Sequence, residues 1–160
     1  MDNASHYYGW CPDQHSQACK QRLLLEACRA TANSYPYLRD RLLYDQYGAL
    51  FTEEAVFQIE GSPELVGRQA ITAALRERGS QGIMRHVSHV VNIAATGEAS
   101  AEAVSYVTIW REETTPTDKA VSGPWIMGEY HDEFQMQNRQ CLISKRVVKI
   151  VFLVAGSVAP

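Results

Sequence analysis

The sequence predicts an α+β domain in which N-terminal helices pack on one face of a curved, mostly antiparallel sheet. Two observations carry this prediction. Apolar residues recur at helical spacing in the first third of the chain, and adjacent segments of alternating polarity fill most of the rest. Because the helices come first and the strands then follow one another directly, a helix layer on an antiparallel sheet is favoured over repeated βαβ units.

Two helical segments are expected before the first strand. Residues 17–32 carry apolar side chains at helical spacing, with charged side chains on the other side. Pro36 is expected to break or kink this helix near residues 34–35, because proline removes a backbone donor and crowds the preceding turn. A second helix is predicted over residues 38–51, where leucines and a tyrosine form an apolar stripe.

The remainder of the chain reads as strands with one more helix. Alternation predicts a first strand over residues 52–59, and a short amphipathic helix over 68–78 is stopped by Gly79. Further strands are expected over residues 85–93, 101–110, 122–137 and 141–153. The organisation predicted from these elements is an irregular arm over 1–16, a single domain over 17–153 and a loose tail over 154–160.

Composition and charge limit the classes of partner that are expected for the chain. Its 160 residues fit one domain with a sizeable core. The formal net charge is −3, with 15 basic and 18 acidic residues mixed along the sequence, so nucleic acid is not an expected partner. The longest apolar run, VVKIVFLVA, is far shorter than the roughly 20 residues of a membrane span. The N-terminus has no basic-then-apolar leader, which favours the cytoplasm.

Cofactor and metal chemistry have weak support in the sequence. The chain contains no GxGxxG, GxxxxGK or HExxH pattern, so no cofactor is expected. Cys11, His15 and Cys19 recur every four residues and would align on one helix face, but a zinc site would lack a convincing fourth ligand. In a reducing compartment the four cysteines are expected to be free thiols.

Three phrases in a fixed order carry a family resemblance: LFTEEAVF (50–57), GRQAI (67–71) and MRHVSHVVNI (84–93). Together they resemble the SnoaL-like branch of the nuclear-transport-factor-2-like superfamily over roughly residues 17–153. The resemblance implies a cone-shaped barrel with one deep pocket. It also implies that Asp40 and His86 face each other inside that pocket.

His86 and Asp40 are the first candidate catalytic residues. His86 stands where the dehydratase-like members carry a catalytic histidine, and a histidine can accept and return a proton near neutral pH. Asp40 lies at the family spacing before Phe51 and would stabilise the imidazolium form. The usual Asp-Trp pair that follows is replaced by Leu43-Tyr44. The alternative interpretations are a solvated helix residue for Asp40 and a core histidine for His86.

A second polar set lies in MGEYHDEF (127–134). Alternation puts Glu129 and His131 on one face and Tyr130 and Asp132 on the other. We favour the Glu129 and His131 face as the pocket lining, although a register slip of one residue would exchange the two faces. Glu60, which ends the first strand, is a further candidate, either acting on a ligand or marking a solvated strand end.

The resemblance implies a cofactor-independent isomerase, cyclase or dehydratase that acts by general acid/base catalysis. Its substrate would be a small apolar oxygenated molecule, such as a polycyclic polyketide or terpenoid. Ile59 stands where scytalone dehydratases carry a pocket tyrosine, which argues against that particular dehydration. The alternative is a non-catalytic ligand-binding module or a small structural subunit of a ring-hydroxylating dioxygenase. The apolar open face of the sheet also predicts a homodimer.

Overall fold

The structure is a computed structural model that describes residues 15–78, 82–112 and 123–153. Nearly all of the arm expected over residues 1–16, and all of the tail expected over 154–160, lie outside the described residues. The helices are α1 (Gln17–Asp40), α2 (Tyr44–Gly48) and α3 (Arg68–Arg78). The strands are β1 (Phe51–Ile59), β2 (Leu65–Val66), β3 (Ile83–Ala95), β4 (Ser100–Glu112), β5 (Ile126–Gln137) and β6 (Gln140–Leu153).

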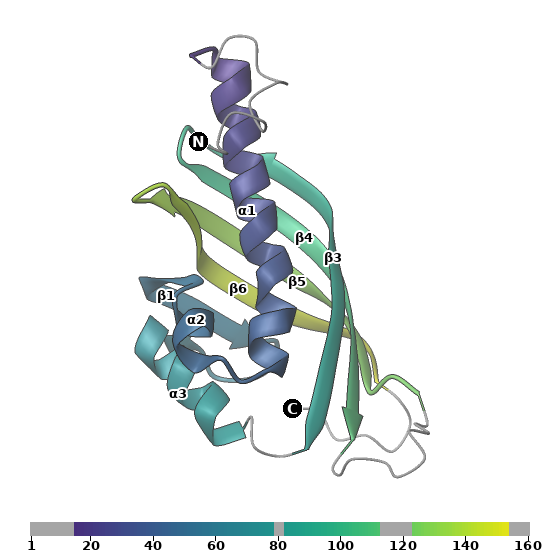
Figure 1. Cartoon of the computed structure of the whole chain (residues 1–160). Coiled ribbons are helices and arrows are strands. Elements are labelled where there is room, and N and C mark those ends of the chain that lie inside the picture. Colours follow the sequence, from purple (N-terminus) through teal and green to yellow (C-terminus); the bar gives the residue numbers. More distant parts are fainter. Residues whose placement is uncertain (1–14, 79–81, 113–122, 154–160) are drawn as a thin grey trace, which may run out of the picture.

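The six strands form one curved, unclosed sheet in the order β2-β1-β6-β5-β4-β3. Every neighbouring pair is antiparallel except β1 and β6, which run parallel. The long helix α1 crosses the concave face of this sheet, and α2 and α3 lie together at the end near β1 (Figure 1). The predicted α+β class, with N-terminal helices on a mostly antiparallel sheet, is therefore confirmed.

The predicted elements after residue 51 match the observed ones closely. β1 begins one residue before the predicted strand, and α3 has the predicted bounds. The later strands differ by a few residues at their ends, where periodicity is weakest as a signal. The two-residue strand β2 was not predicted, because a segment that short carries no period.

Pro36 was expected to break or kink the first helix, and it does not break it. α1 continues through Pro36 to Asp40, and the separate helix predicted over residues 38–51 is reduced to the five residues of α2. A proline inside a helix costs about 3 kcal/mol. One face of α1 is buried against the sheet before Pro36, and beyond it Leu38 packs against the core and Asp40 hydrogen-bonds His86, so these contacts offset the cost. The buried residues of this face are Cys19, Leu24, Cys28, Ala32 and Tyr35.

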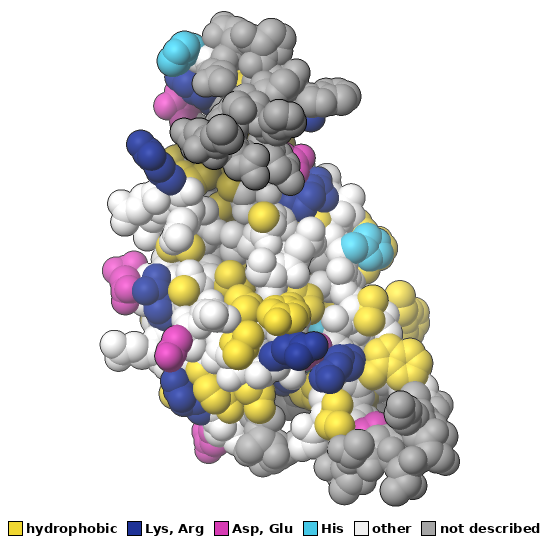
Figure 2. Space-filling view, viewed as in Figure 1, with side chains coloured by type: hydrophobic (Ala, Val, Ile, Leu, Met, Phe, Trp, Pro, Cys, Tyr) yellow, Lys and Arg dark blue, Asp and Glu magenta, His cyan; other side chains and the backbone are white. Residues whose placement is uncertain are grey.

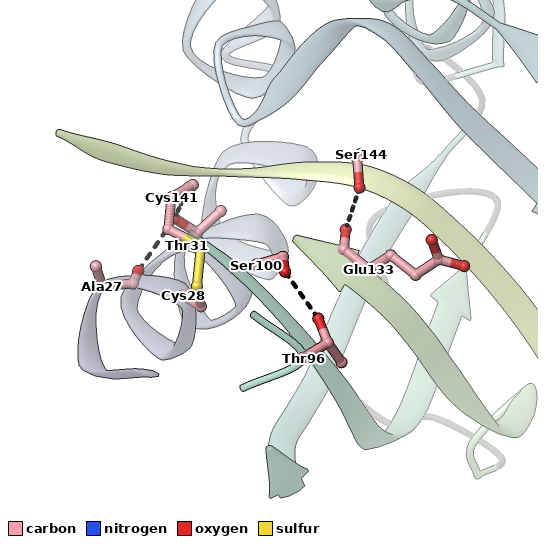
Figure 3. Close-up of a disulfide and its surroundings, with 8 residues drawn as sticks. All are labelled: Ala27, Cys28, Thr31, Thr96, Ser100, Glu133, Cys141 and Ser144. Atoms are coloured by element: carbon pink, nitrogen blue, oxygen red, sulfur yellow. Dashed lines mark hydrogen bonds between the residues drawn. A yellow bond between two sulfur atoms is a disulfide. The ribbon is translucent and has the colours of Figure 1, made fainter. Parts of the chain in front are cut away.

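The expectation of free thiols is also wrong for the described cysteines. Cys28 on α1 and Cys141 on β6 form a disulfide (Figure 3), and Cys19 is disulfide-bonded as well. Beside the bond, the Thr31 hydroxyl donates a hydrogen bond of 2.5 Å to the Cys141 carbonyl oxygen. Disulfides persist in oxidising compartments, so this bond argues against the reducing compartment that the free-thiol expectation assumed.

The core fills the space between α1 and the concave face of the sheet. Tyr35, Tyr47 and Phe51 form an aromatic cluster there, with ring centroids 5.3–6.3 Å apart. Side chains from the inner faces of the strands complete it, including Val107, Phe134, Ile143 and Val148. Within the described residues, no helix is both long and apolar enough to cross a membrane.

The disulfide should stabilise the fold measurably. It closes a loop with a sequence separation of 113 residues, which restricts the unfolded chain. We expect the double variant Cys28→Ala/Cys141→Ala to lose about 2–5 kcal/mol of unfolding free energy, measured by urea denaturation. The same comparison in the presence of a reductant is the control, because every disulfide is then open in both proteins and the remaining difference reports the packing lost with the two sulfur atoms. Equal midpoints for oxidised wild type and the double variant would contradict the prediction.

Candidate active site

A pocket of about 400 Å³ opens on the concave side of the sheet. Its walls are largely apolar, and side chains from the three helices and the six strands line it. The apolar lining includes Phe57, Ile59, Ile71, Leu75, Ile126 and Val148. The polar and aromatic lining consists of Tyr35, Arg39, Tyr47, Arg78, His86, Arg111, Trp125 and Tyr130. A concave apolar cavity with a few converging polar groups is the usual form of a small-molecule site.

The structure brings Asp40 and His86 together at one wall of this pocket. Oδ1 of Asp40 lies 2.5 Å from Nδ1 of His86, and Oδ2 of Asp40 accepts a hydrogen bond of 2.7 Å from the His86 backbone N–H. Both side chains are nearly buried, with 7% and 5% of their surfaces exposed. Asp40 ends α1 and His86 lies on β3, so the continuation of the helix past Pro36 is what places the carboxylate against the strand.

Burial lowers the pKa of His86 from its ordinary value of 6.5. The hydrogen bond that the Asp40 carboxylate accepts raises the pKa of His86, whereas the nearby Arg39 guanidinium lowers it, and burial outweighs the carboxylate. The imidazole is therefore neutral at neutral pH. With an acidic partner at Nδ1, the neutral ring keeps its proton on Nδ1 and donates it to Asp40.

Nε2 of His86 is the nitrogen that remains for chemistry. His86 lines the pocket, and within the described part of the chain no residue hydrogen-bonds Nε2. Nε2 itself is not fully buried, so it is accessible from the pocket. An unprotonated imidazole nitrogen held in an apolar cavity can accept a proton from a bound molecule.

Three tyrosines line the same cavity. Burial raises the pKa of Tyr47 and that of Tyr130 well above the ordinary value of 10.0, so both phenols stay protonated. The Tyr35 ring packs against both, with centroids at 5.4 Å and 5.5 Å. Neutral phenols can donate hydrogen bonds to an oxygen on which negative charge develops.

A buried ion pair lies directly behind these tyrosines. Arg146 on β6 and Asp132 on β5 are both fully buried and make two hydrogen bonds of 2.6 Å and 2.7 Å. The Arg146 guanidinium also lies over two rings, 3.9 Å from the centroid of Tyr35 and 4.3 Å from that of Tyr130. This arrangement fixes two of the pocket tyrosines from behind.

The prediction that the Glu129 and His131 face of β5 lines the pocket is wrong. Tyr130 and Asp132 point inward, and Glu129 and His131 lie on the outer face of the sheet, away from the pocket. There the Glu129 carboxylate and the His131 ring pair at 2.7 Å, with about a third of each side chain exposed. The sequence did contain a signal for the correct face. Ile126 and Phe134 share a face with Tyr130, and the more apolar face of a strand is the one expected to be buried.

Glu60 also lies outside the pocket. It is exposed one residue after β1 ends, whereas its neighbour Ile59 lines the cavity. The solvated strand end is therefore the correct interpretation of this residue. The pocket arginines and Trp125 were missed by sequence reasoning, because long side chains at the ends of elements show no periodic signal. In the described segments, no group of three His, Cys, Asp or Glu residues is arranged to hold a metal ion.

Solved structures share this fold at low sequence identity. A protein named "Putative Scytalone Dehydratase" from Novosphingobium aromaticivorans superimposes with a TM-score of 0.72 and 20% identity, covering 84% of this chain and 88% of its own. ActVI-ORFA from Streptomyces coelicolor gives a TM-score of 0.66 and 21% identity over 80% and 97% of the two chains. A ketosteroid isomerase-like protein from Erwinia carotovora gives 0.66 and 14% over 80% and 96%. These likenesses establish the fold.

Sequence comparison identifies the family. No functionally curated protein matches the chain. The family model described as a SnoaL-like domain, however, matches residues 21–147, which include Asp40, His86 and most of the pocket lining. The chain therefore belongs to the SnoaL-like family.

Proposed function

We propose that the protein is a cofactor-independent enzyme that moves a proton on an apolar, polycyclic secondary metabolite of polyketide or terpenoid type, by isomerisation, cyclisation or elimination. The observation that supports this proposal is the neutral, buried His86, whose Nδ1 is held by Asp40 and whose Nε2 is accessible from an apolar pocket. Such an arrangement fits a general base, which contributes about 10²–10⁴-fold to a rate.

Each group has a role in this proposal. Nε2 of His86 would take a proton from a carbon next to a carbonyl group, and Asp40 would stabilise the imidazolium that forms. The phenols of Tyr130 and Tyr47 would stabilise the oxygen that becomes negative. The imidazolium would then return the proton to another carbon or to a leaving oxygen. The small volume and the apolar walls favour a compact hydrophobic skeleton.

The base can be tested without the natural substrate by using 5-nitrobenzisoxazole, an apolar compound that opens when a base removes its C–H proton. We expect the wild type to accelerate this ring opening over buffer, because His86 presents an unprotonated nitrogen inside an apolar cavity. His86→Ala should lose about 100-fold or more of that rate. Phenolate release, followed by absorbance, gives the measurement.

His89→Ala is the matched control for that experiment. His89 lies on the same strand three residues away, is exposed on the outer face of the sheet and contacts the Tyr106 ring. Its removal should leave the ring opening unchanged. Loss of activity in His89→Ala equal to that in His86→Ala, or no loss in either variant, would place the base elsewhere.

Asp40→Asn should shift the pH dependence of the same reaction. The Asp40 carboxylate raises the pKa of His86 against the effect of burial, so its replacement by an amide lowers that pKa further. The rate falls on the acidic side as Nε2 becomes protonated, so this limb should move to lower pH in the variant. The plateau rate should also fall, because the amide cannot stabilise the imidazolium cation. The pH–rate profiles of both proteins measure the two effects.

The double variant distinguishes a dyad from two independent residues. If Asp40 acts through His86, then Asp40→Asn/His86→Ala should be no slower than His86→Ala alone. Additive losses would show that Asp40 contributes by another route.

We also propose that the protein is a homodimer formed through the outer face of the sheet. Val87, Met127 and Phe152 lie in one cross-strand row of this face and are 63%, 44% and 64% exposed. Tyr106, in the adjoining row, is 46% exposed. A row of exposed apolar side chains of this kind is costly in water and suits the centre of a self-complementary two-fold interface, with polar side chains such as Glu129 and His131 around it.

Sedimentation at micromolar concentration tests the dimer. We expect the wild type to sediment as a dimer and Met127→Lys as a monomer, because a charge in the centre of the face cannot be buried without a partner. Val66→Lys is the control, since Val66 is 62% exposed on the edge strand β2, which β1 separates from the strands that carry this row. A monomeric wild type would contradict the proposal and favour the alternative, a subunit that needs a different chain.

A further inference from the structure

We infer that the substrate of this pocket is an apolar molecule that carries a carboxylate group, held by arginine side chains at the pocket wall. The inference builds on the proposed function, because it names the substrate class of the same site. It depends on the charges that line the cavity and on one buried donor that no described residue satisfies.

The lining of the pocket has charges of only one sign in the described residues. Arg39, Arg78 and Arg111 all line the cavity, and no aspartate or glutamate does. Elsewhere in the fold, arginines meet carboxylates: Arg68 pairs with Glu53, Arg76 with Asp45, and Arg146 with Asp132. In the space-filling view, Lys and Arg side chains lie among hydrophobic ones over the C-terminal end of α1 and the adjoining β3 (Figure 2).

The three pocket guanidiniums are poorly compensated. Arg39 approaches Asp40 at 3.9 Å, but both oxygens of that carboxylate are already bound by His86. Arg78 and Arg111 form no ion pair with any residue that the structure describes. Positive groups beside low-dielectric walls create a strong local field, which favours an anion in the cavity.

Arg111 gives the most direct indication of a ligand. Its Nε is buried and has no hydrogen-bond partner among the described residues. Its guanidinium lies 4.9 Å from the centroid of the Trp125 ring, which also lines the pocket and holds the group in place. A buried donor without an acceptor costs free energy, and an acceptor on a bound molecule would remove that cost.

A carboxylate fits these groups better than other acceptors. The planar fork of a guanidinium matches the two oxygens of a carboxylate, and charge-assisted bonds of this kind are about twice as strong as neutral ones. The rest of the cavity is apolar, so the skeleton that bears the carboxylate must be hydrophobic. The resulting substrate has an apolar body with an acid-bearing end, and His86 is positioned to act on the body.

The test compares two probes of nearly equal shape, 2-naphthoate and 2-naphthamide, by isothermal titration calorimetry. We expect the wild type to bind 2-naphthoate about tenfold or more tightly than 2-naphthamide, because only the first carries a charge that the arginines can pair. Arg111→Gln should remove most of this preference. Arg139→Gln is the matched control, since Arg139 lies in the β5–β6 turn, outside the pocket lining, and should retain the full preference.

Further variants keep the result interpretable. Arg78→Gln alters an exposed residue, so it should fold even if Arg111→Gln does not, and it should also reduce the preference. His86→Ala should keep the preference while losing proton transfer, so a failure of the proposed chemistry would leave this inference standing. Equal affinity of the wild type for the two probes, or an unchanged preference in both arginine variants, would falsify the inference.

Discussion

The ion pair between Arg146 and Asp132 is the interaction on which the pocket depends. The two residues are register partners on neighbouring strands, and their side chains have no exposed surface. Burial by itself lowers the pKa of Arg146, but the Asp132 carboxylate holds that pKa above its ordinary value, so the charge is kept inside the protein. Breaking a buried pair by removing one partner typically costs about 3–5 kcal/mol. The pair must therefore form whenever the core forms.

The pair also organises what surrounds it. Because the guanidinium lies over the rings of both Tyr35 of α1 and Tyr130 of β5, one cation joins the helix to two strands of the sheet. These two rings are part of the pocket wall. Further along the same helix, Asp40 reaches β3 and holds His86. Tyr35, which packs on the Arg146 guanidinium, and Asp40, which holds His86, thus lie on one helix, so the contact at Tyr35 helps to set the position of Asp40.

The sequence predicted the architecture well because the architecture follows from periodicity. The alternating polarity of the strands and the helical spacing of apolar residues in α3 are clear enough to locate these elements within a few residues. Pro36 misled the prediction, because local propensity was outweighed by burial of a helix face that no local window contains. The pairing of Asp40 with His86 was accessible only through the family resemblance, since 46 positions separate them in the sequence.

The charges and protonation states in the pocket could not be predicted from the sequence. Whether Glu129 or Tyr130 faces inward depends on register, and a choice based on polar identity selected the solvated face. The arginines of the lining come from the ends of α1, α3 and β4, which approach one another only in the folded chain. Burial, which sets the protonation state of His86, is likewise a property of the assembled core.

The disulfide between Cys28 and Cys141 has a consequence for the integrity of the chain. It spans a stretch that contains both Asp40 and His86, whereas Arg146 lies beyond it. A single proteolytic cut anywhere between residues 28 and 141 would leave two fragments that remain covalently linked. A nicked molecule could then keep its strands paired and its acid–base residues adjacent, and its fragments would separate on a denaturing gel only after the disulfide had been reduced.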